Sequence, residues 1–161
     1  MGEMIKYKCK KCNYNLELYE GIGMLFDYEK FVHPTKHPDS MWSKVIKSKD
    51  ILRKIDDLFL NYNGKFIYKK EVYNEESDEY SDDYLPYGYK LYYSKKRKMV
   101  YSLFDFEIEY IENGKKKIYK PEYEKNINYD LIPLEDELLP DVKCPKCGGR
   151  MHYVPCLIMW D

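Results

Sequence analysis

The sequence contains no alanine and no glutamine, and only 3 of its 161 residues are histidine. Alanine is the strongest helix former, so its absence disfavours a mostly helical protein. Scarce histidine leaves few groups that titrate near neutral pH, and the neighbouring residues indicate no Ser-His-Asp or Cys-His arrangement. An enzyme is therefore the weakest functional class for this chain.

Long apolar stretches are also missing. No run approaches the ~20 consecutive apolar residues that a membrane-spanning helix needs, and the N-terminus lacks the apolar region of a secretory signal. The 27 basic and 28 acidic side chains nearly cancel, for a net charge of −1. A protein with so small a net charge has no overall electrostatic field that would attract a nucleic acid or a membrane surface. We expect a cytoplasmic protein, in which paired cysteines favour metal ligation over disulfides.

Aromatic residues make up much of the apolar content, with 19 tyrosines and 6 phenylalanines. Tyrosine, phenylalanine and isoleucine favour strands, so the fold leans towards sheet. Exposed tyrosines could stack on bases or line a partner interface. Lys, Tyr, Ile, Asn and Phe all have A/T-rich codons, so an A/T-rich genome would raise the frequency of all five. The tyrosine content can therefore be explained without a binding function.

Local patterns predict an α+β fold. Alternating apolar residues predict a hairpin over 4–19, and 3- and 4-residue apolar spacing predicts one or two helices over 41–62, with a break near Ser48–Asp50. The Asn113-Gly114 pair, which favours a type I′ turn, predicts a hairpin over about 99–120. Further strands are expected over 65–73 and 85–93.

Three polar segments are expected to be loops. The acidic run 75–83 is predicted to be a mobile, solvated loop, with metal or basic-partner binding as the alternative. The basic run 95–98 is predicted to be a solvated turn, with phosphate contact as the alternative. His33 and His37 have i, i+4 spacing, but the prolines among them disfavour the helix that would make them a metal pair.

Four cysteines carry the strongest signal. They form two C-x-x-C pairs, Cys9 with Cys12 and Cys144 with Cys147, and 131 residues separate the pairs. Each pair can place two thiolates on one tight turn, which is half of a tetrahedral metal site. Such a turn favours a residue that tolerates positive φ after its second cysteine, and Asn13 and Gly148 meet that need.

These turns resemble those of zinc ribbons and rubredoxin-like knuckles. The matching residues are Tyr7–Tyr14 and Cys144–Gly149, and the ends of the chain also resemble uncharacterised bacterial zinc-ribbon proteins of unassigned activity. The resemblance implies a discontinuous ribbon built from 1–26 with 140–161, enclosing an inserted α+β region over 27–139. Asn13 in place of the usual glycine and the long separation between the pairs depart from the family pattern.

One zinc ion per chain, held by Cys9, Cys12, Cys144 and Cys147, is the predicted cofactor. Four thiolates close the coordination sphere, so the metal would be structural. Iron in a rubredoxin-like site, a site shared between two chains and a dithiol redox pair are the alternatives. Cys156 is interpreted as a spare buried thiol, and His152 as the other candidate ligand.

The favoured function is a non-catalytic module that binds a protein partner, as an adaptor does. Nucleic-acid binding is the alternative, since basic residues gather near both cysteine pairs: Lys8, Lys10, Lys11, Lys143, Lys146 and Arg150, with Lys95–Lys98 as an addition. Electron transfer through a bound iron ion is the third candidate function.

Overall fold

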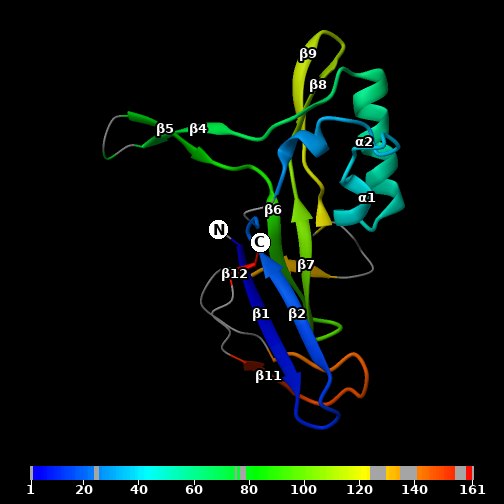
Figure 1. Ribbon diagram of the computed structural model, residues 1–161, viewed down its shortest axis with the longest axis vertical. Coiled ribbons are helices and arrows are strands. Elements are labelled where there is room, and N and C mark those ends of the chain that lie inside the picture. The colour runs from blue at the N-terminus through cyan, green and yellow to red at the C-terminus, as the bar shows by residue number, and fades with distance from the viewer. Residues whose placement is uncertain are drawn as a thin grey trace. The chain divides into compact units, whose positions relative to one another are not determined.

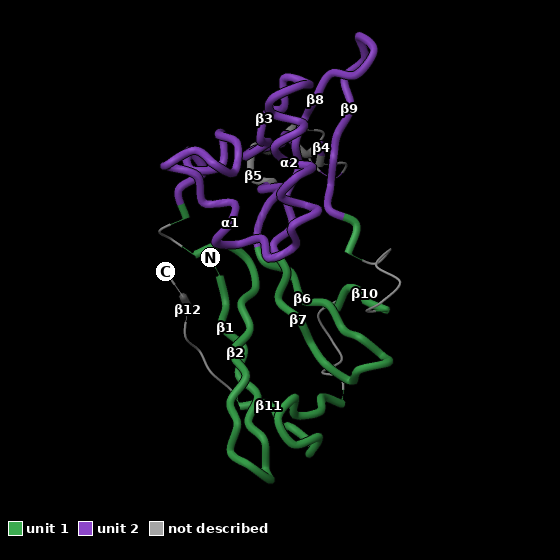
Figure 2. Tube along the Cα trace, turned by 90° about the vertical axis from the view of Figure 1, so that its right-hand side faces the viewer, with its two compact units in different colours: residues 1–26, 89–103, 122–161 green, residues 27–88, 104–121 purple. Residues whose placement is uncertain are grey.

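The structure, a computed structural model, describes residues 2–23, 26–74, 76, 79–123, 130–134, 141–154 and 159–160. The chain folds into two compact units, shown in Figure 2. Unit 1 comprises residues 1–26, 89–103 and 122–161, and unit 2 comprises 27–88 and 104–121. The described part is mostly β-strand with two α-helices, as the predicted α+β class requires. The predicted domain division, 1–26 with 140–161 against 27–139, stays a prediction.

A long first strand organises unit 1. β1 (Gly2–Cys9) pairs antiparallel with β2 (Asn15–Glu20), which confirms the predicted N-terminal hairpin. On its other edge, β1 pairs with β11 (Met151–Val154) near the cysteines and with β12 (Met159–Trp160) near its start. The two ends of the chain therefore meet along a hydrogen-bonded ladder, and Figure 1 shows the N and C labels beside these strands.

A second sheet of unit 1 consists of β10 (Leu131–Pro133), β6 (Gly88–Ser94) and β7 (Met99–Asp105), in that order. Its Leu91, Tyr93 and Val100 join Tyr7 and Leu18 in one buried cluster. Cys9, Cys144 and Met151 belong to the same cluster. The core of unit 1 thus extends to the cysteines, so the turns that carry them rest on packed apolar side chains.

Helices appear only in unit 2 among the described residues, and they confirm the predicted break. α1 (Trp42–Val45) and α2 (Lys49–Asn61) follow the short 3-10 helix η1 (Tyr28–Phe31). The Ser48 hydroxyl accepts a hydrogen bond from the Ile51 N–H and caps α2, because Ser48 has the extended backbone of an N-cap. Asn63, at φ 51°, turns the chain after α2, because asparagine tolerates the left-handed backbone region.

Aromatic side chains fill the core of unit 2. Trp42 is fully buried, meets Phe31 edge-on at 4.8 Å between ring centroids and lies 4.7 Å from Phe106. Its indole N–H donates a hydrogen bond to the His33 carbonyl at 3.0 Å. The one polar group of the buried ring therefore has a hydrogen-bond partner. The core also contains Ile46, Ile55, Leu58, Phe66, Phe104 and Ile108.

The predicted Asn-Gly hairpin is present but shorter than expected. β8 (Ile108–Glu112) pairs with β9 (Lys115–Tyr119), while β3 (Lys65–Phe66) pairs with the other edge of β8. Asn113 and Gly114 have φ of 52° and 72°, as a type I′ turn requires. The prediction that the hairpin reaches back to residue 99 was wrong, because 99–105 form β7, which pairs with β6.

Glu107 lies between β7 and β8. The alternation of Phe104, Phe106 and Ile108 with Asp105, Glu107 and Glu109 predicts that Glu107 is exposed, yet it is only 2% exposed. Its carboxylate forms ion pairs with Lys70 and with Lys120, the latter at 2.5 Å. Burial raises the pKa of Glu107, but the two ammonium groups outweigh burial and hold the pKa below its usual 4.5.

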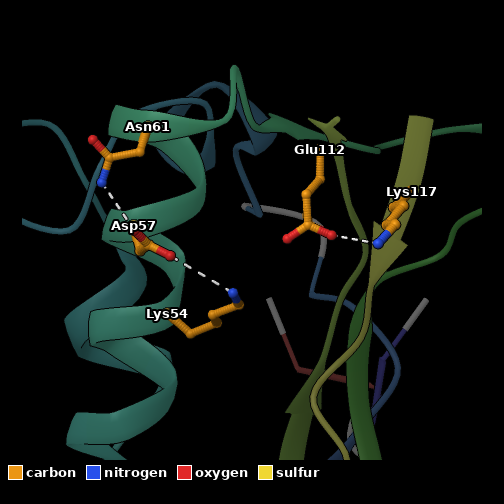
Figure 3. Close-up of polar contacts among 5 residues, drawn as sticks. All are labelled: Lys54, Asp57, Asn61, Glu112 and Lys117. Atoms are coloured by element: carbon orange, nitrogen blue, oxygen red, sulfur yellow. Dashed lines mark hydrogen bonds and ion pairs between the residues drawn. The ribbon is translucent and has the colours of Figure 1, made fainter. Parts of the chain in front are cut away.

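The surface of unit 2 carries paired charges. Lys116 contacts Glu109 across the hairpin at 3.1 Å. Figure 3 shows Glu112 joined to Lys117 on the hairpin, and Asp57 between Lys54 and Asn61 on α2.

The acidic run is not the loop that the sequence predicted. β4 (Lys70–Asn74) pairs with β5 (Glu79–Tyr84), so most of the run is one strand of a two-stranded ribbon (Figure 1). Backbone N–H and C=O groups of the two neighbouring segments form this ladder, which the acidic composition of the run does not reveal. Glu75, Ser77 and Asp78 lie outside the described residues. Among those described, neither helix has the length and apolar character needed to cross a bilayer.

Candidate metal centre

The four predicted ligands come together at one end of unit 1. Cys9 ends β1 and Cys12 lies in the following turn, while Cys144 and Cys147 lie in the turn that precedes β11. The antiparallel ladder that aligns Cys9 with Met151 brings the two turns side by side. Cys9 and Cys144 are buried, and Cys12 and Cys147 are half-buried.

The first turn is a complete knuckle. The Cys9 N–H donates to the Tyr14 carbonyl at 2.8 Å, and the Asn13 N–H donates to the Cys9 carbonyl at 3.1 Å. The Lys11 N–H donates to the Cys9 sulfur at 3.4 Å. Asn13 has φ 57°, as its position after the second cysteine predicts. The backbone therefore holds Cys9 and Cys12 on one side of the turn.

The second turn repeats these bonds at the same offsets. The Cys144 N–H donates to the Gly149 carbonyl, and the Gly148 N–H donates to the Cys144 carbonyl, each at 2.8 Å. The Lys146 N–H donates to the Cys144 sulfur at 3.4 Å, and Gly148 has φ 68°. Two segments from opposite ends of the chain thus make the same turn around one centre.

The sulfur positions fit a tetrahedral ion. All four Sγ atoms lie within 4.8 Å of one another, with Cys9 to Cys147 at 3.5 Å and Cys12 to Cys144 at 3.6 Å. A zinc ion with Zn–S bonds of 2.3 Å sets a tetrahedral S–S edge of roughly 3.8 Å. A disulfide needs about 2.05 Å. The residues present fit a metal and not a pair of disulfides.

Electrostatics at the cluster favour a bound cation. Burial raises the pKa of the Cys9 thiol, but hydrogen bonds from the backbone N–H groups of Cys12 and Lys11 outweigh it and lower the pKa to about 6. For Cys12, a backbone hydrogen bond at Tyr14 lowers the pKa, while burial and the thiols of Cys147, Cys144 and Cys9 raise it to about 12. The first thiol of the cluster thus ionises readily, and its negative charge opposes ionisation of the next. A bound cation would offset this repulsion between thiolates.

Gly149 is a site residue that the sequence did not single out. A Cβ at this position would lie 3.1 Å from the Lys11 Cβ, 3.3 Å from the Cys147 sulfur and 3.4 Å from the Cys9 sulfur. The absent side chain lets the second knuckle approach the first. The Gly-Gly pair after Cys147 was the available signal, but the contact that explains its second member comes from the other end of the chain.

The other candidates lie apart from this cluster. The rings of His33 and His37 stack at 3.9 Å in unit 2, and the Asp39 N–H donates to His37 Nδ1. His152 lies on β11 opposite Lys8 and is not among the clustered ligands, and its buried Nδ1 has no hydrogen-bond partner among the described residues. Cys156 lies outside the described residues.

No protein-family model, curated protein or solved structure matches this chain. The zinc-ribbon likeness therefore rests on the geometry of the two knuckles. Within the described ranges, these four cysteines form the one group of potential ligands close enough to share an ion.

Proposed function

We propose that this protein is a non-catalytic zinc-ribbon protein in which one zinc ion per chain is bound by Cys9, Cys12, Cys144 and Cys147. The observation that carries this proposal is the clustering of four sulfurs within 4.8 Å of one another on two matching knuckles. Zinc binds four thiolates in a closed tetrahedral site, which leaves no position for substrate. When bound, the ion supplies a cross-link and not a reaction.

The clamp joins the first and last parts of the chain. β1 already pairs with β11 and β12, so the ion would reinforce a ladder rather than replace one. Its contribution would be greatest at the cysteine end, where the two turns meet through backbone contacts and Gly149. The adaptor role, the protein partner and the cytoplasmic location stay predictions.

Metal analysis of the purified full chain, together with its mass in solution, tests the proposal. We expect one zinc per monomer and a colourless protein. Cys144→Ser should lose the metal, whereas the matched change Cys156→Ser should retain it, because Cys156 is the one cysteine outside the predicted ligand set. A red protein containing iron would favour the electron carrier. A dimer that holds two metal ions and dissociates when they are chelated would favour intermolecular sites, because each C-x-x-C pair would then meet its own copy.

A further inference from the structure

Two adjacent rows of residues cross the knuckle end of unit 1. The inner row is Cys9, Met151 and Val142, aligned by the β1–β11 register and by the Met151 N–H donating to the Val142 carbonyl. These side chains are 0%, 4% and 1% exposed. Successive residues of paired strands alternate between faces, so the next row must face the solvent.

That outer row is entirely basic. The Lys10 N–H donates to the Arg150 carbonyl at 3.4 Å, and Arg150 is bridged to Lys143. The Lys143 N–H in turn donates to the Lys98 carbonyl at 2.8 Å. All four side chains are exposed. We call these four residues, Lys10, Arg150, Lys143 and Lys98, the basic ladder.

Further cations flank the basic ladder. Lys98 ends the exposed turn Lys95–Lys98, and the exposed Lys8 of β1 precedes Lys10 by two residues. The single acidic residue in segments 8–15, 95–98 and 141–150 is Asp141, which lies 3.1 Å from the Arg150 side chain. A nearly neutral chain therefore gathers an excess of positive charge here, in which Lys10, Lys98 and Lys143 have no ion pair among the described residues and Arg150 has one.

Such a row is unfavourable for folding. Like charges directly opposite one another in a ladder destabilise it, whereas opposite charges stabilise it. The β8–β9 hairpin instead brings opposite charges together, since Lys116 contacts Glu109 and Lys117 contacts Glu112 across the two strands at offset positions. The fold gives three of the four ladder cations, Lys10, Lys143 and Lys98, no ion pair among the described residues, and an anion bound along the ladder would relieve their repulsion.

We propose that the basic ladder, with the Lys95–Lys98 turn, binds the phosphate backbone of a nucleic acid without reading its sequence. Four segments at the usual strand spacing span roughly 14 Å, which is about four nucleotides at 3.4 Å per phosphate. The proposal rests on the proposed metal clamp, which would hold the knuckles in register.

The composition of the surface favours nucleic acid over other anionic partners. Protein interfaces centre on aromatic or aliphatic anchors, and amphipathic membrane surfaces place apolar side chains beside their cations. No large hydrophobic side chain is exposed in the described segments 8–15, 95–98 and 141–150. Lysine and arginine with no apolar neighbour are what a phosphate backbone requires.

Fluorescence anisotropy with a labelled 20-nucleotide single strand and the matching duplex tests this proposal. The full chain is titrated at several salt concentrations between 50 and 200 mM. We expect binding that weakens steeply with salt. The ladder variant carries Lys10→Gln, Lys143→Gln and Arg150→Gln. It should bind about tenfold or more weakly and lower the log–log salt slope by about 2 on single strands.

A matched control removes the same charge elsewhere. The triple variant Lys30→Gln, Lys36→Gln and Lys44→Gln changes three exposed lysines of unit 2. It should bind as the unchanged protein does. Equal losses of nucleic-acid affinity in the two variants would overturn the proposal. The affinity would then depend on the net charge and not on the position of the charges.

Other results would also contradict it. Absence of binding at 50 mM salt by the metal-loaded protein would do so, as would binding to phosphatidylserine vesicles without binding to nucleic acid. Metal content is measured on the same samples. A folded, metal-free protein that binds through the ladder would overturn the proposed zinc clamp and leave this proposal standing. A zinc-loaded protein that binds no nucleic acid would do the reverse.

Discussion

The knuckle end of unit 1 and the β8–β9 hairpin of unit 2 are both exposed antiparallel pairings rich in lysine. On the hairpin, Lys116 and Lys117 contact Glu109 and Glu112 (Figure 3 shows the second pair). At the knuckles, Lys10, Arg150 and Lys143 line up with one another. Ion pairs between opposite charges therefore stabilise the hairpin. At the knuckle end, like charges gather beside the cysteine cluster. This difference is the basis for the proposal that the knuckle end, and not the hairpin, binds an anionic partner.

Chelation should produce the largest difference between the two regions. Removing the metal eliminates a cross-link that is worth about 10 kcal/mol or more in small zinc domains. We expect amide exchange in β1 and β11 to accelerate by about 100-fold or more, and exchange in α2 and β8 to change by less than about threefold. Hydrogen-exchange mass spectrometry measures both regions in one sample. Equal acceleration throughout would mean that the clamp stabilises the whole chain.

The buried carboxylate of unit 2 gives the second largest effect. Replacing both of its partners, Lys70→Met with Lys120→Met, leaves Glu107 buried and unpaired. Unfolding in urea at pH 7 should show a loss of about 3–5 kcal/mol. The control Lys116→Met should cost less than about 1 kcal/mol, because its partner Glu109 lies on the surface.

The direction in which this stability loss changes with pH follows from the pKa of Glu107. The folded pKa of Glu107 lies below its unfolded value, so its contribution to stability is present above about pH 4.5 and is lost as the pH falls through the folded pKa. In the double variant burial acts without opposition and raises the pKa. The variant should therefore recover stability relative to the unchanged protein between pH 7 and pH 4. A constant difference between the two proteins would contradict the assignment.

Glycine substitutions compare the turns of the two regions. Gly148 in the knuckle and Gly114 in the hairpin have φ of 68° and 72°, and a Cβ would meet nothing within 4 Å at either. Alanine at each should cost about 1 kcal/mol in urea unfolding, from the left-handed backbone alone. Gly148→Asn should cost less, since Asn13 occupies the same position in the other knuckle. Gly149→Ala should weaken metal binding as well, owing to its sulfur contacts.

Charge reversal should give the smallest effects, with opposite signs. Lys10→Glu places a carboxylate opposite Arg150 and should stabilise the protein by about 0.2–1 kcal/mol. Lys116→Glu replaces the ion pair with Glu109 by a like-charge contact and should destabilise the protein by a similar amount. Thermal unfolding at low salt measures both, and added salt should shrink both differences. Destabilisation by Lys10→Glu would mean that the row is not a repulsive one.

Local signals predicted the elements that are defined by neighbours in sequence. The Asn-Gly turn, the break in the helical segment before Lys49 and the N-terminal hairpin are confirmed. Asn13 and Gly148 adopt the positive φ expected of them. These features depend on backbone sterics within a few residues, which composition and spacing encode directly.

Errors arose where a distant segment decided the outcome. Glu107 looked exposed by alternation, but lysines from elsewhere in unit 2 allow it to be buried. Residues 99–105 looked like one arm of a hairpin and instead pair with β6. The acidic run looked like a loop until β4 supplied a partner strand.

The four cysteines show both contributions. Their spacing determined that each end of the chain makes a knuckle, because two thiolates and a turn fit within six residues. Only the tertiary structure decided that the knuckles share one centre, through the β1–β11 ladder and the approach at Gly149. It also decided that Lys98, far from either end in sequence, lies beside Lys143 and completes the basic ladder. Contacts between segments so far apart depend on register and packing, which a local pattern does not contain.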